Sequence, residues 1–102
     1  PGDTIMTRTQ KELFDGMNED QKDFFGAVLE EMSRAEEKHK GWPEDAVHAV
    51  SILNEEAGKL TQACNDYKFC NSTANAPYDR MNKKAVSTAA MALRLWHGMG
   101  TY

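Results

Sequence analysis

The sequence has little of what marks several large classes of protein. Its two cysteines are too few for a disulfide framework, and it has only three prolines in 102 residues. No apolar run approaches the roughly 20 residues of a membrane-spanning helix, so we expect no membrane partner. The 16 Asp and Glu outnumber the 12 Lys and Arg and no basic tract occurs, which argues against nucleic-acid binding. This length predicts one domain.

The N-terminal segment lacks the pattern of a signal peptide. Its sequence, PGDTIMTRTQ, has no apolar stretch of the kind found in a secretory signal peptide. We therefore expect a cytoplasmic protein in which Cys64 and Cys70 are reduced thiols. Residues 1–17 are expected to form an N-terminal arm or a short helix, and residues 18–102 a single helical domain.

The apolar residues of the chain recur at the three- and four-residue spacing of helices. No segment alternates apolar and polar residues as a strand would. Asn18 and Gln21 predict a capping box at the start of a helix that ends near Lys38, with Gly41 as the stop. Pro43 predicts the start of a second long helix. The apolar seam of that helix is expected at Val47, Val50, Leu53, Ala57, Leu60 and Cys64.

A last helix is predicted from about Pro77 to His97, after the polar loop CNSTANAP. Three helices of roughly 20 to 27 residues leave a thin core in so short a chain. The predicted fold class is therefore all-α, an antiparallel helical bundle completed by oligomerisation as a homodimer or tetramer. Gly58 lies within the second long helix and is expected to cost about 1 kcal/mol relative to alanine unless close packing requires it.

The densest polar cluster is Asn54-Glu55-Glu56-Ala57-Gly58-Lys59, which lies beside the expected seam. Two carboxylates there suit a hard cation such as Mg²⁺, which takes one or two carboxylates together with phosphate oxygens. The simpler interpretation is a solvated helix face, on which Glu55 and Lys59 form an i,i+4 ion pair. Spacing alone favours the solvated face.

A resemblance to a known family rests on two stretches, RAEEKHKGWPEDAVHAVSILNEEAGKLTQACNDYKF and MNKKAVSTAAMALRLW. Together they resemble the MazG-like all-α nucleoside triphosphate pyrophosphohydrolases, in particular the short forms carried by phages and mobile elements. The elements WPEDAVH, EEAGKL and AAMALR make the resemblance specific. In that family one helix supplies Glu-Glu-x-x-Glu and the next supplies Glu-x-x-Asp, and these carboxylates hold Mg²⁺ while water cleaves the triphosphate. The resemblance implies a MazG-like fold.

The metal-binding positions of that family are only partly kept. Glu55 and Glu56 stand where its first two glutamates belong, as remnant metal ligands. Lys59 stands at the third position, and Lys84 and Ser87 stand where the next helix has Glu and Asp. Because lysine repels Mg²⁺ and cannot ligate it, the resemblance implies a pseudoenzyme that needs no cofactor. Mg²⁺ would be required if the protein were active.

Three functions stay open at this point. In the first, the protein binds a nucleotide or another phosphorylated ligand without cleaving it, with Lys59, Lys84 and Ser87 as ligand-binding candidates. In the second, Glu55 or Glu56 pairs with Lys84 across the helices, and the fold serves a phage or mobile element as an interaction protein. The third is an active Mg²⁺-dependent dNTP pyrophosphohydrolase.

Two further residues are ligand-binding candidates. Trp42 precedes a predicted helix, where its ring could stack on a base, although such a tryptophan more often pins a loop to the core. His48 lies about two turns before the glutamates, and a lone helical histidine is more often a packed or solvent-bonded residue.

Overall fold

The computed structural model describes residues 6–69 and 76–102. These residues form the helices α1 (Arg8–Asp15), α2 (Glu19–Lys38), α3 (Ala46–Phe69) and α4 (Ala76–His97), followed by the 3₁₀ helix η1 (Gly98–Thr101). Neither described range contains a strand, so the all-α class is confirmed. None of the described helices combines the length and the apolar character needed to cross a bilayer. Cys70 lies outside the described residues, whereas Cys64 is an exposed free thiol.

Helix α2 begins and ends where the sequence predicts. The Asn18 side chain accepts a hydrogen bond from the Gln21 backbone N–H at 2.8 Å, and the Gln21 side chain accepts one from the Asn18 N–H at 2.9 Å. This reciprocal pair is the predicted capping box. The helix ends at Lys38, and Gly41, with a φ of 91°, takes the left-handed conformation that turns the chain toward α3.

Helix α3 begins at Ala46, three residues later than the position of Pro43 predicts. The Oδ2 atom of Asp45 accepts a hydrogen bond from the His48 backbone N–H at 3.1 Å. A carboxylate at this position satisfies one of the free N–H groups of the first turn, which a proline ring cannot do. The prediction of a start at Pro43 is wrong for this reason.

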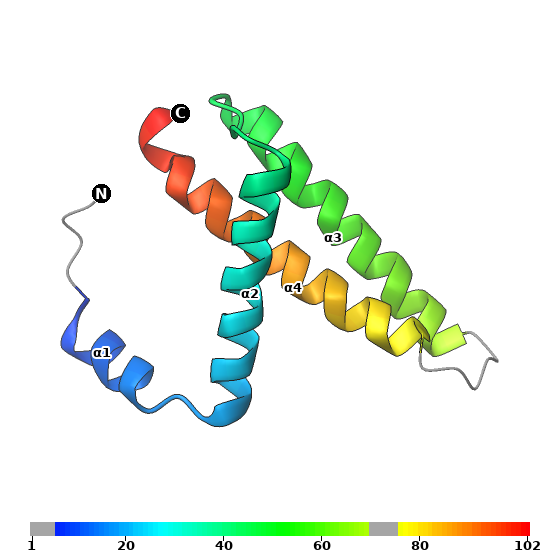
Figure 1. Cartoon of the computed structure of the whole chain (residues 1–102), viewed down its shortest axis with the longest axis horizontal. Coiled ribbons are helices and arrows are strands. Elements are labelled where there is room, and N and C mark those ends of the chain that lie inside the picture. The colour runs from blue at the N-terminus through cyan, green and yellow to red at the C-terminus, as the bar shows by residue number, and fades with distance from the viewer. Residues whose placement is uncertain (1–5, 70–75) are drawn as a thin grey trace.

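Helix α4 is the centre of the arrangement. Helices α3 and α4 lie side by side and antiparallel, while α2 crosses α4 at a steep angle (Figure 1). Helix α1 stands apart from these three, and its Leu13 and Phe14 are exposed (Figure 1). The packing is therefore bundle-like, with a two-helix hairpin on which α2 is laid crosswise.

The core is small and lies where α2, α3 and α4 meet. Val28 of α2 and Ala90 and Met91 of α4 form its buried centre. Partly buried side chains pack around them: Met32, Ala35, Trp42, Ile52, Leu53, Val86, Ala89 and Leu93. Within the described residues no large side chain is fully buried, so a thin core is what this arrangement provides.

The buried face of α3 is rotated away from the predicted seam. Ala49 and Ala63 are fully buried, whereas Val47 is 74% exposed and Cys64 is also exposed. Alanine allows the backbones of two helices to approach closely, so the face with the smallest side chains is the one turned to α4. Val50, a third position of the predicted seam, is also exposed, at 39%. The seam prediction is therefore wrong at three of its six positions, and the other three are partly buried.

Two glycines should respond oppositely to alanine substitution. A Cβ at Gly58 would meet nothing within 4 Å, so Gly58→Ala should stabilise the protein by about 0.5–1 kcal/mol through helix propensity. A Cβ at Gly98 would lie 2.5 Å from the Tyr102 hydroxyl and 3.2 Å from Cδ1 of Trp42. Gly98→Ala should therefore destabilise by about 1–3 kcal/mol. Thermal denaturation shows whether each variant is more or less stable than the unmodified protein. A stabilised Gly98→Ala protein would contradict this packing.

Candidate functional site

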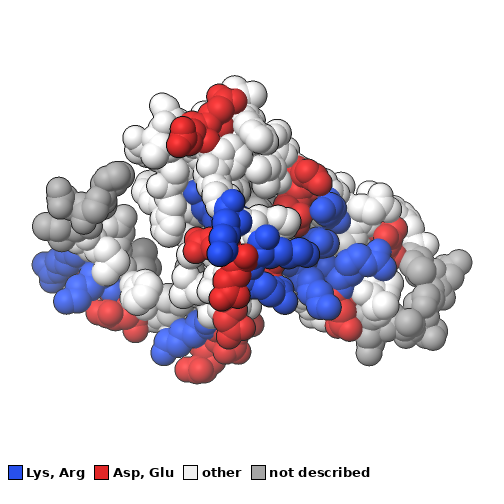
Figure 2. Space-filling view, turned by 45° about the horizontal axis from the view of Figure 1, so that its top comes forward, with Lys and Arg blue, Asp and Glu red and all other residues white. Residues whose placement is uncertain are grey.

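A groove of 640 Å³ lies between α2, the connection from α2 to α3, α3 and α4. Its charged side chains are Glu31, Arg34, Lys38, Glu55, Glu56, Lys59, Lys84 and Arg94. We call it the basic groove, because cationic side chains outnumber carboxylates there in a chain whose net charge is −4. Figure 2 shows Lys and Arg side chains gathered near the middle of the molecule, with Asp and Glu beside them.

Most of the residues singled out in the sequence line this groove. Glu55, Glu56 and Lys59 reach it from α3, and Lys84 and Ser87 reach it from α4. The two helices bring these positions together because α3 and α4 run side by side. The two polar motifs, separated by more than 20 residues of sequence, thus contribute to one site.

Of the two remaining candidates, Trp42 lies in the groove and His48 lies outside it. Trp42 lines the groove and also packs against the core, so it pins the connection in the way that such a tryptophan commonly does. His48 is exposed on α3 and is not among the residues that line the groove. Its described partners are bound through the backbone: its N–H donates to the Asp45 carboxylate, and its carbonyl oxygen accepts from the Ser51 hydroxyl at 2.6 Å.

Lys59 is paired with carboxylates of its own helix. Its Nζ lies 3.2 Å from Oε1 of Glu56 and 3.7 Å from Oε1 of Glu55. The hydrogen bond from Lys59 to Glu56, together with the charge of that carboxylate, raises the pKa of Lys59 above the usual lysine value. Lys59 therefore stays charged throughout the neutral range and beyond it on the alkaline side.

Glu56 also reaches across to the next helix. Its Oε2 atom is buried and accepts no hydrogen bond from any described residue, and the Nζ of Lys84 lies 3.8 Å from it. This contact is an ion pair without a hydrogen bond, and both side chains are partly buried, Glu56 at 19% and Lys84 at 29% exposure. The charge of Glu56 is thus balanced from two sides, by Lys59 and by Lys84.

These residues do not fit a magnesium ion. The described residues contain no group of three or more acidic, histidine or cysteine side chains that could hold a metal. Lys59 and Lys84 place two ammonium groups within 4 Å of Glu56, where they would repel a divalent cation. The buried Oε2 atom of Glu56 is compensated by Lys84 and leaves no set of oxygen ligands for Mg²⁺.

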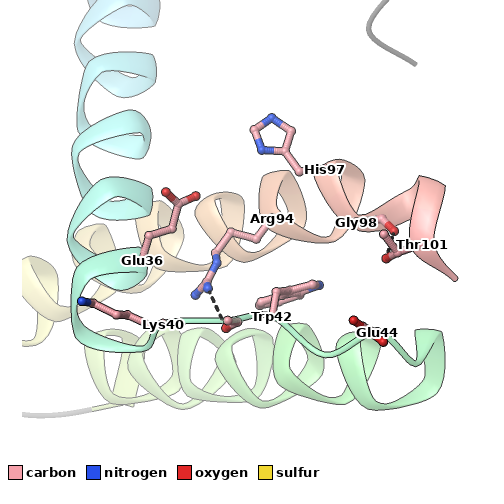
Figure 3. Close-up of a pocket in the computed structure, with 9 residues that line it drawn as sticks. Glu36, Lys40, Trp42, Glu44, Arg94, His97, Gly98 and Thr101 are labelled. Atoms are coloured by element: carbon pink, nitrogen blue, oxygen red, sulfur yellow. Dashed lines mark hydrogen bonds between the residues drawn. The ribbon is translucent and has the colours of Figure 1, made fainter.

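The sequence analysis missed the charged residues that α2 contributes to the groove, and it also missed Arg94 of α4. Arg94 is only 7% exposed, and its Nη2 atom donates to the carbonyl oxygens of His39 and Gly41 at 3.4 and 3.3 Å. Its guanidinium lies 4.6 Å from the ring centroid of Trp42 (Figure 3). Helical spacing could have pointed to Arg94. It follows Met91 by three residues and Ser87 by seven, which places all three on one face of α4.

Behind Arg94 and Trp42 lies a second cavity, of 500 Å³, toward the C-terminal turn (Figure 3). The indole Nε1 of Trp42 donates to the hydroxyl of Tyr102 at 2.6 Å. The Tyr102 hydroxyl in turn donates to the carbonyl oxygen of Leu95 at 3.4 Å. Trp42 is therefore held by Arg94 on its ring and by Tyr102 at its edge.

Comparison with known proteins finds no family model, no curated protein and no solved structure that matches the chain.

The contact between Glu56 and Lys84 predicts a difference between the two lysines of the groove. Among the described residues, Lys84 is the one cross-helix partner of the buried Glu56 oxygen, and Lys84→Met should destabilise the protein by about 1–3 kcal/mol. Lys59→Met is the matched control, since Lys59 is half-exposed and its ion pairs should contribute little. Chemical denaturation measures both, and equal losses would contradict the burial of this pair.

Proposed function

We propose that the protein is a catalytically degenerate, MazG-like helical protein that binds a nucleotide or another phosphorylated ligand in the basic groove. The observation that carries the proposal is the concentration of charge. Five of the 12 Lys and Arg line this one groove, although the chain as a whole is acidic. The five cations and three carboxylates of the groove leave an excess of two positive charges, which attracts anionic ligands. Phosphate, with its several acceptor oxygens, suits lysine and arginine donors.

The positions of the motifs support the MazG-like assignment. The resemblance predicts that residues 55, 56 and 59 of one helix and residues 84 and 87 of the next share a site. In the structure these five side chains line the same groove, and Glu56 meets Lys84 between α3 and α4. A resemblance confined to local sequence would not require these positions to converge.

The same groove argues against hydrolysis. Cleavage of a triphosphate by this class of enzyme depends on metal ions that neutralise the phosphate oxygens and orient water. The carboxylates that line the groove are Glu31, Glu55 and Glu56. Glu31 is paired with Arg34, and the other two are paired with Lys59. Lysine side chains supply positive charge for binding but do not position an attacking water as a metal ion does.

Calorimetry with a panel of nucleoside mono- and triphosphates tests the proposal. We expect binding of at least one phosphorylated compound, and no release of pyrophosphate above background with or without Mg²⁺. The variant that combines Lys59→Glu, Lys84→Glu and Ser87→Asp restores the carboxylates of the family pattern. It should bind Mg²⁺, which the natural sequence should not. Turnover of any dNTP by the natural sequence above about 1 per second, an ordinary enzyme rate, would contradict the proposal.

A second candidate function is that of an interaction protein of a phage or mobile element. It is favoured by the pairing of Lys59 and Lys84 with glutamates, which uses part of the positive charge of the groove. It is also favoured by apolar surface on α2, where Phe25 and Leu29 are 52% and 53% exposed. A protein that binds no phosphorylated compound but captures a defined protein partner would have this function.

The thin core and this apolar surface lead to a prediction about assembly. Contiguous apolar surface that a single chain leaves exposed commonly marks a protein interface. We propose that the chain forms a homodimer or a tetramer, in which Phe25 and Leu29 lie at the interface. Light scattering at micromolar concentration should give at least twice the chain mass, and Leu29→Ser should lower it. A clean monomer under these conditions would contradict the prediction.

A further inference from the structure

We infer that the anionic group of the ligand binds at Arg94 and Lys38, at the α2 end of the basic groove, and not between Lys59 and Lys84. This inference rests on the proposed function, because it places a phosphate in the same groove. It also narrows the ligand class to a phosphate monoester. The single phosphate lies at Arg94, and the organic part extends along α4 toward Lys84.

The Lys59–Lys84 end of the groove is balanced in charge. Lys59 lies within 4 Å of oxygens of both Glu55 and Glu56, and Lys84 lies within 4 Å of Glu56. Two ammonium groups therefore face two carboxylates. A phosphate placed there would gain two cations but would lie beside two like charges, and the net attraction is small.

The α2 end of the groove is not balanced. Arg34 is paired with Glu31 of its own helix. No carboxylate oxygen of the described residues lies within 4.0 Å of a charged nitrogen of Lys38 or of Arg94. Arg94 donates to the carbonyl oxygen of His39, the residue that follows Lys38, so both cations lie at the α2 end of the groove, Lys38 exposed and Arg94 buried. A buried charge without a counter-ion is costly, and an anionic ligand would supply the counter-ion.

Arg94 has N–H donors left for such a ligand. A guanidinium carries five N–H donors in one plane, and in the described chain only those of Nη2 have acceptors. The stacking of the guanidinium on Trp42 holds the orientation of that plane. A planar, fixed guanidinium binds phosphate in a bidentate manner, with better geometry than a flexible ammonium.

The length and lining of the groove indicate the rest of the ligand. Lys84 and Arg94 are ten residues apart on α4, which is about 15 Å along the helix axis. Ser87 and Met91 line the groove between them and provide one hydroxyl and one apolar wall. A phosphate at Arg94 therefore leaves room for an organic group that ends beside the balanced charges. A polyphosphate spanning the groove would instead bring negative charge against Glu56.

The test is a titration of the full chain followed by NMR of the indole N–H groups. The probes are inorganic phosphate, adenosine monophosphate and inorganic triphosphate, at constant ionic strength. We expect inorganic phosphate to shift the signal of Trp42, which stacks on Arg94, and not that of Trp96, which is 63% exposed. Adenosine monophosphate should bind at least tenfold more tightly than inorganic phosphate, and more tightly than inorganic triphosphate. The reverse order of the last two would overturn the assignment of a monoester.

Variants locate the phosphate. Lys38→Met should weaken binding at least threefold and Arg94→Lys at least tenfold. Lys22→Met is the matched control, since Lys22 is an exposed lysine of α2 outside the groove, and it should change nothing. Lys38 is exposed, so its removal leaves the fold intact and any loss of binding reports on the ligand. Circular dichroism and thermal denaturation check this for each variant.

Two outcomes would overturn the inference, and they are distinguishable. If Lys59→Met and Lys84→Met abolish binding while Lys38→Met and Arg94→Lys leave it unchanged, the phosphate lies at the other end of the groove. The proposed function would then stand and this inference would fail. If neither the three probes nor the nucleotide panel bind to the unmodified protein, the proposed function itself fails.

Discussion

The rest of the structure depends on one buried cation, Arg94. Burial of a guanidinium is unfavourable unless partners compensate it, and here the α2–α3 connection supplies acceptors for Nη2 and an aromatic face. The carbonyl oxygens of His39 and Gly41 accept from it, and the ring of Trp42 lies against it. His39 is the C-cap of α2, so its carbonyl is at the negative end of the helix dipole, where a cation is favoured. One side chain of α4 thus fixes the end of α2, the path of the connection and the place of Trp42.

The same face of α4 that holds Arg94 contributes both to the core and to the groove. Met91 belongs to the buried centre of the core and also lines the groove, one turn before Arg94 on α4. Lys84 and Ser87 follow the same face of the helix toward its N-terminal end. The helix that organises the packing of α2 and α3 therefore also carries the α4 side of the groove. With so few buried side chains, a change that repacks α4 would move the groove as well.

The sequence predicted some parts of this molecule well because the forces that determine them are local. The capping box of Asn18 and Gln21 depends on four consecutive residues, and it was found where expected. The start of α3 was misplaced because Pro43 and Asp45 both favour a helix start, and only the hydrogen bond from His48 to Asp45 decides between them. The buried face of α3 depends on how closely α4 approaches, which no single segment of sequence encodes.

The ion pair that joins α3 to α4 in the groove also depends on more than local sequence. From sequence, Lys59 and Lys84 were the expected phosphate ligands, because a family pattern gave those positions a role. That pattern could not show which cations have acidic partners, since the pairing of Glu56 with Lys84 joins two helices. Arg94 carried no motif signal and is distinguished only by its burial and by its lack of an acidic partner among the described residues. A binding site in a charged groove is defined by the charge that remains after pairing. In this groove, the cations without an acidic partner among the described residues are Arg94 and Lys38, beside the connection that Arg94 itself holds in place.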